Sequence, residues 1–162
     1  MLRAPRRAFV AQWGYRGAPP VDAAWLALRT SNATSRVLLP NTRGTVAFGT
    51  NEVPNDGSNP NCTAPLCSQG FSVELFVNLA NNSAKLDGMG FSPFGVVTDM
   101  TPADQLYAGY GECADLCDVE AGDPYCAAKP GGGWEGVNLT AFLAEGSAYT
   151  RRNFPLLDYV RG

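Results

Sequence analysis

Five cysteines fall into two groups along the chain, and their thiols are the first candidates for chemistry. The first group is Cys62 with Cys67, and the second is Cys113 with Cys117 and Cys126. Four thiolates are enough for a structural zinc site, but the spacing of Cys113 and Cys117 is unlike that of tight zinc knuckles. A disulfide-stapled loop is favoured if the chain is secreted or lumenal. Neither alternative makes a cysteine catalytic, and the odd count leaves at least one unpaired.

Histidine is absent from the sequence. This excludes Ser-His-Asp and Cys-His catalysis, together with every metal site that needs an imidazole ligand. The glycine-rich turn LDGMGFSPFG at Leu86–Gly95 has no following Lys-Ser/Thr pair, so phosphate binding is disfavoured.

The segment GFSVELFVNL at Gly70–Leu79 alternates as a strand does. One face, expected to be core, would hold Phe71, Val73, Leu75, Val77 and Leu79. The other face would hold Glu74, Phe76 and Asn78. Phe76 thus stands between two polar residues and could form the floor of a shallow groove, although ordinary packing is the favoured interpretation.

Charge is unevenly spread along the chain, whose formal net charge is -3. Residues 1–43 hold seven arginines against one acid, whereas residues 112–123 hold five acids and no base. An arginine-rich start suits a transit peptide or a nucleic-acid arm, but apolar residues such as Phe9 and Trp25 interrupt it. We interpret it as folded protein and expect no nucleic-acid partner.

Neither a membrane span nor a secretory signal is recognisable, so a soluble protein is expected. Four N-x-S/T triplets, at Asn32, Asn61, Asn81 and Asn138, would suit a secreted glycoprotein, although such triplets also arise by chance. The compartment stays open, and the cysteines and triplets are compatible with a secretory or organellar lumen.

Length and an apolar content of 45% predict one globular domain spanning residues 1–162. The expected strands are Phe9–Trp13, Val37–Leu39, Gly44–Phe48, Phe71–Leu79, Phe94–Thr98 and a final Leu156–Val160. No long helix separates the first five, which favours an antiparallel sheet or barrel.

Three short helices are also expected. Asp22 is a candidate N-cap for Ala23–Arg29, and Thr101 with Pro102 begins a second helix. A third lies in Asn138–Asn153, which Gly146 weakens and Pro155 ends. Loop insertions are expected at about 52–69 and 113–134, each enclosing one cysteine group.

Taken in order, six segments resemble the cyclophilin family, most closely its divergent bacterial-like members. FVAQWG resembles the family's F-x-x-Q strand, RGTVAFGTN its G-T-[VI]-x-[MF]-A strand, and ELFVNL its Q-[LF]-F-I-x-[LT] strand. LDGMGFSPFGVV resembles the L-D-x-x-x-x-x-F-G-x-V segment, QLYAGYGE the helix end after it, and EGSAYTRRNFPLLDYV the C-terminal helix and strand.

This resemblance implies a mostly β fold with a few short helices, arranged as a cyclophilin-like antiparallel β-barrel. The family's opening, roughly two strands and a helix before F-x-x-Q, has no counterpart here. The barrel is therefore expected to be incomplete at the N-terminus, with exposed sheet edges.

The resemblance also implies peptidyl-prolyl cis-trans isomerase activity during protein folding, in a monomer without cofactor or metal. Proline-containing segments of unfolded or exposed proteins would be the partners. By position in the motifs, the residues that would line the proline pocket or its rim are Phe9, Val10, Phe76 and Leu86. Gln12 would contact the substrate backbone, and Gly49 would border the peptide groove.

Three departures from the family pattern concern charged residues. The family's catalytic arginine would fall on Ala4, so Arg3 takes its place only with a one-residue insertion. Glu74 replaces a glutamine and could pair with an arginine at the groove, and Lys85 stands where many members have tryptophan.

Two alternatives to an isomerase remain. One is a catalytically impaired cyclophilin-like module that binds proline-containing peptides without accelerating their exchange. The other is a cysteine-stapled or zinc-stabilised interaction protein whose function resides in the two insertions.

Overall fold

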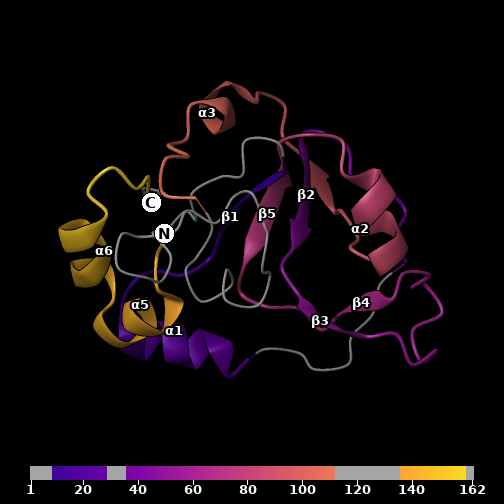
Figure 1. The fold of residues 1–162 in the computed structure, drawn as a ribbon, viewed down its shortest axis with the longest axis horizontal. Helices are drawn as coiled ribbons and strands as arrows, with labels where there is room; N and C mark the ends of the chain where they lie inside the picture. Colours follow the sequence, from indigo (N-terminus) through magenta and orange to yellow (C-terminus); the bar gives the residue numbers. More distant parts are fainter. Residues whose placement is uncertain (1–8, 29–35, 112–135, 160–162) are drawn as a thin grey trace, which may run out of the picture.

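A four-stranded antiparallel sheet forms the centre of the computed structural model, which describes residues 9–28, 36–111 and 136–159 (Figure 1). In spatial order its strands are β1 (Val10–Trp13), β5 (Leu75–Asn78), β2 (Thr45–Phe48) and β6 (Gly95–Val96). A separate hairpin pairs β3 (Asn51–Pro54) with β4 (Leu66–Gln69). The helices are α1 (Pro19–Leu26), α2 (Ser83–Met89), α3 (Thr101–Asp104), α5 (Leu139–Glu145) and α6 (Ser147–Asn153).

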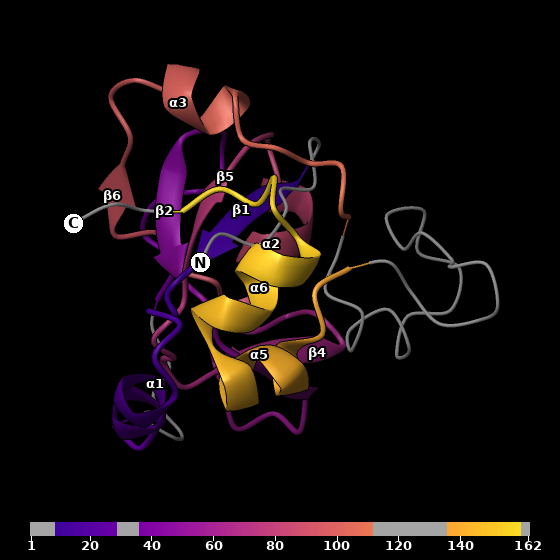
Figure 2. The same ribbon diagram turned by 90° about the vertical axis from the view of Figure 1, so that its left-hand side faces the viewer.

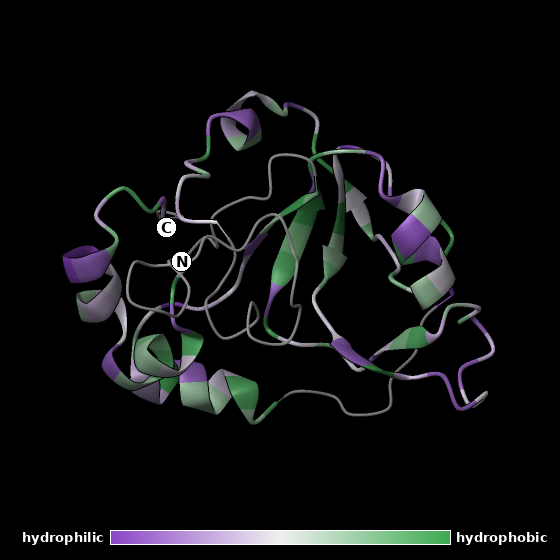
Figure 3. Cartoon of the chain, in the orientation of Figure 1, coloured by the Kyte–Doolittle hydropathy of each residue, from purple (hydrophilic) through white to green (hydrophobic). Residues whose placement is uncertain are grey.

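Both faces of the sheet are covered by other parts of the chain. On one face Phe76 and Ala47 pack beneath α2 with Leu86. On the other face Val77 and its neighbours on β1 and β2 pack against residues 97–106, which include α3. Strands buried on both sides lose the polar alternation of half-exposed strands, and Figure 3 shows β5 as largely hydrophobic. Both faces of β5 are therefore core, which agrees with ordinary packing as the favoured interpretation of Phe76.

A third apolar cluster lies beside the sheet, where α1, α5 and α6 gather (Figures 1 and 2). Its buried members are Tyr15, Val137, Phe142, Phe154 and Leu157. Gly146 separates α5 from α6 with a φ of 69°, a backbone conformation that favours glycine. A Cβ at Gly146 would overlap the backbone of Gly17, which accepts a hydrogen bond of 2.8 Å from the Ser147 N–H. The predicted C-terminal helix is thus confirmed, in two parts.

The expected fold class is correct in its antiparallel sheets and short helices but not in its emphasis on β structure. Of the described residues, 28% are helical and 19% lie in strands. The described part of the chain contains no closed barrel, because β1 and β6 are the two edges of an open sheet.

Two of the expected strands are absent. Val37–Leu39 is irregular, since Pro40 removes a backbone donor and the Leu38 side chain is 76% exposed. After Pro155 the chain forms a turn in which the Leu157 N–H bonds to Phe154, and residues 157–159 form no strand. Leu157 packs into the helical cluster instead, while residue 160 lies outside the described part.

Helix α1 begins earlier than expected, whereas α3 begins at Thr101 as predicted. The α1 helix begins at Pro19, and the Asp22 carboxylate accepts bonds of 2.8 to 3.0 Å from the three N–H groups of residues 16–18. Asp22 therefore fixes the turn before the helix and is not its N-cap. Helix α3 does begin at Thr101, but its N–H donates to the Asp99 carboxylate at 2.9 Å. Bonds from the backbone and side chain of Thr101 hold the pKa of Asp99 below its ordinary value.

Three buried asparagines join the loop before β2, the end of β5 and the start of α2. The Asn78 amide donates to Oδ1 of Asn41 at 3.2 Å and to Oγ1 of Thr45 at 2.9 Å, and it accepts 2.7 Å from Asn82. Asn41 in turn donates to the Asp87 carboxylate at 2.7 Å. Asn41 and Asn78 are completely buried, so these bonds replace water for groups whose burial would otherwise be costly.

We predict that Asn78→Ala lowers the free energy of unfolding by about 2 to 4 kcal/mol, because the substitution leaves buried polar atoms of Asn41, Thr45 and Asn82 without their partner. Urea denaturation of both proteins would measure the change. Asn153→Ala is the matched control, since its exposed amide bonds only to the Tyr149 carbonyl, and it should change stability by less than about 0.5 kcal/mol. Equal losses in the two variants would contradict a structural role for the network.

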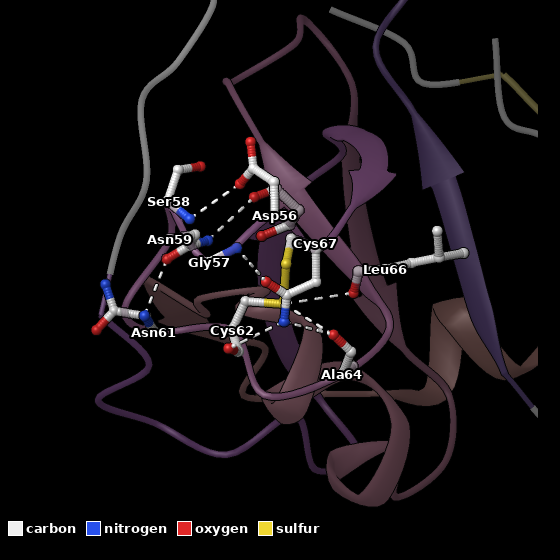
Figure 4. The surroundings of a disulfide bond; sticks show 11 residues. Asp56, Gly57, Ser58, Asn59, Asn61, Cys62, Ala64, Leu66 and Cys67 are labelled. Atoms are coloured by element: carbon white, nitrogen blue, oxygen red, sulfur yellow. Dashed lines mark hydrogen bonds between the residues drawn. A yellow bond between two sulfur atoms is a disulfide. The ribbon is translucent and has the colours of Figure 1, made fainter.

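The expected insertion at 52–69 is an ordered hairpin with a structured tip. Cys62 and Cys67 form a disulfide between the tip and β4 (Figure 4). Side-chain oxygens two residues earlier accept bonds from the N–H groups of Gly57, Ser58 and Asn61. The second expected insertion, 113–134, lies outside the described residues.

The disulfide is expected to stabilise the hairpin mainly by restricting the unfolded chain. A loop of this size corresponds to about 2 kcal/mol. We therefore predict a loss of that order in the free energy of unfolding for the double variant Cys62→Ser with Cys67→Ser, measured by urea denaturation without reductant. Reductant should destabilise the wild type more than the variant, which lacks this disulfide. A variant as stable as the oxidised wild type would contradict this prediction.

Candidate functional site

Seven of the eight residues singled out from the sequence lie on or beside the α2-covered face of the sheet. Gln12 pairs opposite Phe76 in the β1–β5 register, and Ala47 pairs with Phe76 from β2. The seven form two adjoining groups: Gln12, Gly49 and Glu74, and then Phe9, Val10, Phe76 and Leu86. Arg3 lies outside the described residues.

The polar group is closely packed around Gly49. Its N–H donates to the Glu74 carbonyl at 2.7 Å, and its carbonyl accepts 3.0 Å from the Ser72 N–H. A Cβ added at Gly49 would lie 3.0 Å from Nε2 of Gln12 and 3.2 Å from Cβ of Glu74. The Gln12 amide and the Glu74 side chain therefore both lie against Gly49, where the absence of a side chain leaves them space.

The apolar group is a core cluster with one accessible side. Phe76 and Leu86 are 4% and 3% exposed, and the Phe76 ring meets Phe91 edge to face with centroids 5.7 Å apart. Phe9 and Val10 are half-buried and pack against this cluster. Ordinary packing thus describes Phe76, and the surface reachable from solvent is formed by Phe9 and Val10.

Lys85 brings a positive charge to the accessible side of the cluster. Its Nζ lies 5.0 Å from the centroid of the Phe9 ring, within the range of a cation–π interaction. Lys85 is exposed, whereas the next residue, Leu86, points into the core. Helix α2 therefore presents a cation directly beside an apolar contact.

Several residues of the site were missed because α2 was not expected. Met89 and Phe91 complete the apolar cluster, and Ala64 reaches it from the hairpin tip. The sequence did contain a signal for α2, since Asn82 stands at the N-cap position and Gly90 ends the helix with a φ of 85°. Gly88, which lies inside α2, favoured the interpretation of Leu86–Gly95 as a turn.

Metal binding by the first cysteine pair is not supported, because Cys62 and Cys67 are joined in a disulfide. Within residues 9–28, 36–111 and 136–159, no three metal-ligating side chains come together. The other three cysteines lie outside these ranges. The helices in the same ranges include none that is long and apolar enough to cross a bilayer.

No family model, no curated protein and no solved structure matches the chain.

We predict that Gly49→Ala destabilises the protein by about 1 to 2 kcal/mol, because the new methyl group crowds the Gln12 amide and the Cβ of Glu74. Gly95→Ala is the matched control, since Gly95 lies on β6 and a Cβ there meets nothing within 4 Å. That control should stay within about 0.5 kcal/mol of the wild type. Thermal and urea unfolding would measure both, and a neutral Gly49→Ala would mean that the Gln12 amide moves aside freely.

Proposed function

We propose that this chain is a cyclophilin-type peptidyl-prolyl cis-trans isomerase that accelerates rotation about X-Pro bonds during protein folding. The observation that carries the proposal is that three separate segments of the sequence, which supply Gln12, Gly49 and the pair Glu74 and Phe76, come together on or beside one sheet face. These are positions at which the sequence resembles the family's motifs. Chance motif matches would have no reason to meet in space.

The chemistry of this reaction suits a site without histidine or metal. Rotation about a peptide bond has a barrier of about 18 to 20 kcal/mol and requires no bond to be broken. A protein lowers that barrier by binding the twisted amide more tightly than either planar form. An apolar surface for the proline ring and fixed polar groups for the flanking peptide are sufficient.

The described residues provide these two components next to each other. In the proposed complex the proline ring rests on Phe9 and Val10, the accessible side of the cluster that Phe76 and Leu86 support from within. The Gln12 amide, opposite Phe76 on β1, holds a carbonyl of the substrate. Donation to the prolyl nitrogen is assigned to an arginine, for which Arg3 is the candidate from the sequence.

Glu74 is proposed to orient the arginine of this site. It is 7% exposed and lies beside Gln12 and Gly49. A carboxylate there can hold a guanidinium through charge-assisted hydrogen bonds, and it replaces the amide that the family pattern contains. The same pairing sets the main constraint on activity, since an arginine held too firmly by Glu74 is less able to donate to substrate.

The burial of Phe76 favours keeping a second candidate, a module that binds proline-containing peptides without catalysis. With Phe76 and Leu86 only 4% and 3% exposed, a proline ring is met by Phe9 and Val10 and not by a deep pocket. A shallow apolar contact is enough for binding, whereas catalysis also needs the donor in place.

The test is NMR exchange spectroscopy on an Ala-Pro peptide with the purified full chain. We expect wild-type protein to accelerate cis/trans exchange, and Gln12→Ala to reduce kcat/KM about tenfold, as the loss of one transition-state hydrogen bond predicts. Arg3→Ala should abolish most of the acceleration. Phe94→Ala is the control, because it removes a phenylalanine that is 56% exposed and lies outside the cluster.

Circular dichroism and a melting curve on each variant separate loss of activity from loss of fold. A folded wild type that shifts the peptide's resonances without accelerating exchange would identify the binding module. A folded wild type that neither binds nor accelerates exchange would overturn both candidates.

A further inference from the structure

The turn between β5 and α2 presents an asparagine in an N-x-S triplet, Asn81-Asn82-Ser83. Asn81 is exposed, and its Oδ1 accepts bonds from the Ser83 N–H at 3.2 Å and the Ser83 hydroxyl at 2.7 Å. Within the described ranges, nothing bonds to the Asn81 Nδ2. The nitrogen of the side chain therefore faces solvent while its oxygen holds the turn.

The triplets at Asn61 and Asn138 do not combine an exposed asparagine with an unbonded Nδ2. Asn138 is half-buried, and its Oδ1 caps α5 by accepting 2.6 Å from the Ala141 N–H. The triplet at Asn61 runs through Cys62, which is 8% exposed and bound in the disulfide. Asn32 lies outside the described residues.

The disulfide bears separately on whether the chain enters the secretory lumen, where such triplets are glycosylated. Disulfides such as Cys62–Cys67 persist in oxidising compartments, and the secretory lumen is one of them. N-linked glycosylation of N-x-S/T triplets takes place in secreted proteins. A chain that gains this disulfide in the secretory lumen also meets the enzyme that attaches glycans.

We propose that Asn81 is an acceptor site for an N-linked glycan. The donor is an oligosaccharide linked through pyrophosphate to a lipid. The bond between the sugar C1 and the phosphate oxygen breaks, a bond from Nδ2 to C1 forms, the lipid pyrophosphate leaves, and one amide proton is lost to a base of the transferase.

The folded protein tolerates this product without rearrangement. Glycosylation consumes a hydrogen of Nδ2 but leaves Oδ1 unchanged, so both bonds from Ser83 persist. The neighbouring Asn82 stays buried with its amide bonded to Asn78 and to the carbonyl of Phe9. The sugar extends into solvent from Asn81, the exposed residue of the triplet.

The test is to direct the full chain through the secretory pathway of a eukaryotic cell line and to measure glycosidase-sensitive mass in total cellular protein. We expect a glycan on the Asn81 peptide of the wild type, its loss in Asn81→Gln and Ser83→Ala, and its retention in Ser83→Thr. Asn138→Gln is the matched control and should keep the glycan. Peptide mapping after enzymatic removal should show Asn81 converted to aspartate.

Because total cellular protein is measured, a variant that misfolds is still included in the peptide analysis. A wild type without glycan on the Asn81 peptide, or a glycan on that peptide that persists in Ser83→Ala, would overturn the proposal. Neither result bears on isomerase activity, which the exchange experiment measures separately.

Discussion

The hydrogen-bond network around Asn78 is the interaction on which the arrangement of the sheet and α2 depends. A completely buried amide at the end of an inner strand is stable only when its donors and acceptors find partners, and Asn78 finds them in Asn41, Thr45 and Asn82. These partners come from the loop before β2 and the start of α2. The network therefore fixes three segments relative to one another at one point.

The same network determines where the apolar cluster forms. Asn82 bonds to the carbonyl of Phe9 at 2.8 Å, which holds the start of β1 against the turn into α2. From this turn, α2 directs Leu86 onto Phe76, and the Phe9 side chain packs at the edge of the same cluster. The hydrogen bonds of Asn82 at the strand ends thus determine that Leu86, one helical turn further on, contacts Phe76. At the opposite end of β5, Gly14 and Gly49 lie against Glu74, and a Cβ at either position would crowd it.

Sequence reasoning predicted the four strands of the sheet, because alternation and turn residues are local signals. It named the candidate site residues through resemblance to a family and not through periodicity, and seven of them lie on or beside one sheet face. It did not identify α2, since Gly88 and Gly90 read as a turn when the packing of Leu86 and Met89 is unknown. Nor could it give the roles of Asn41 and Asn78: asparagine is usually exposed, and only the tertiary structure supplies the partners that make its burial favourable.

The hairpin at 51–69 changes how the cysteine pair relates to the candidate site. From its tip, the N–H groups of Thr63 and Ala64 both bond to the Gly88 carbonyl at the end of α2, at 2.8 and 3.0 Å. Ala64 also packs against the cluster that contains Phe76. The disulfide closes this tip, so it stabilises the segment that supports α2 from the side away from β1. The hairpin and the candidate site on the sheet face therefore form one connected structure. The hairpin acts on the site by holding α2, the helix that carries Lys85 and Leu86.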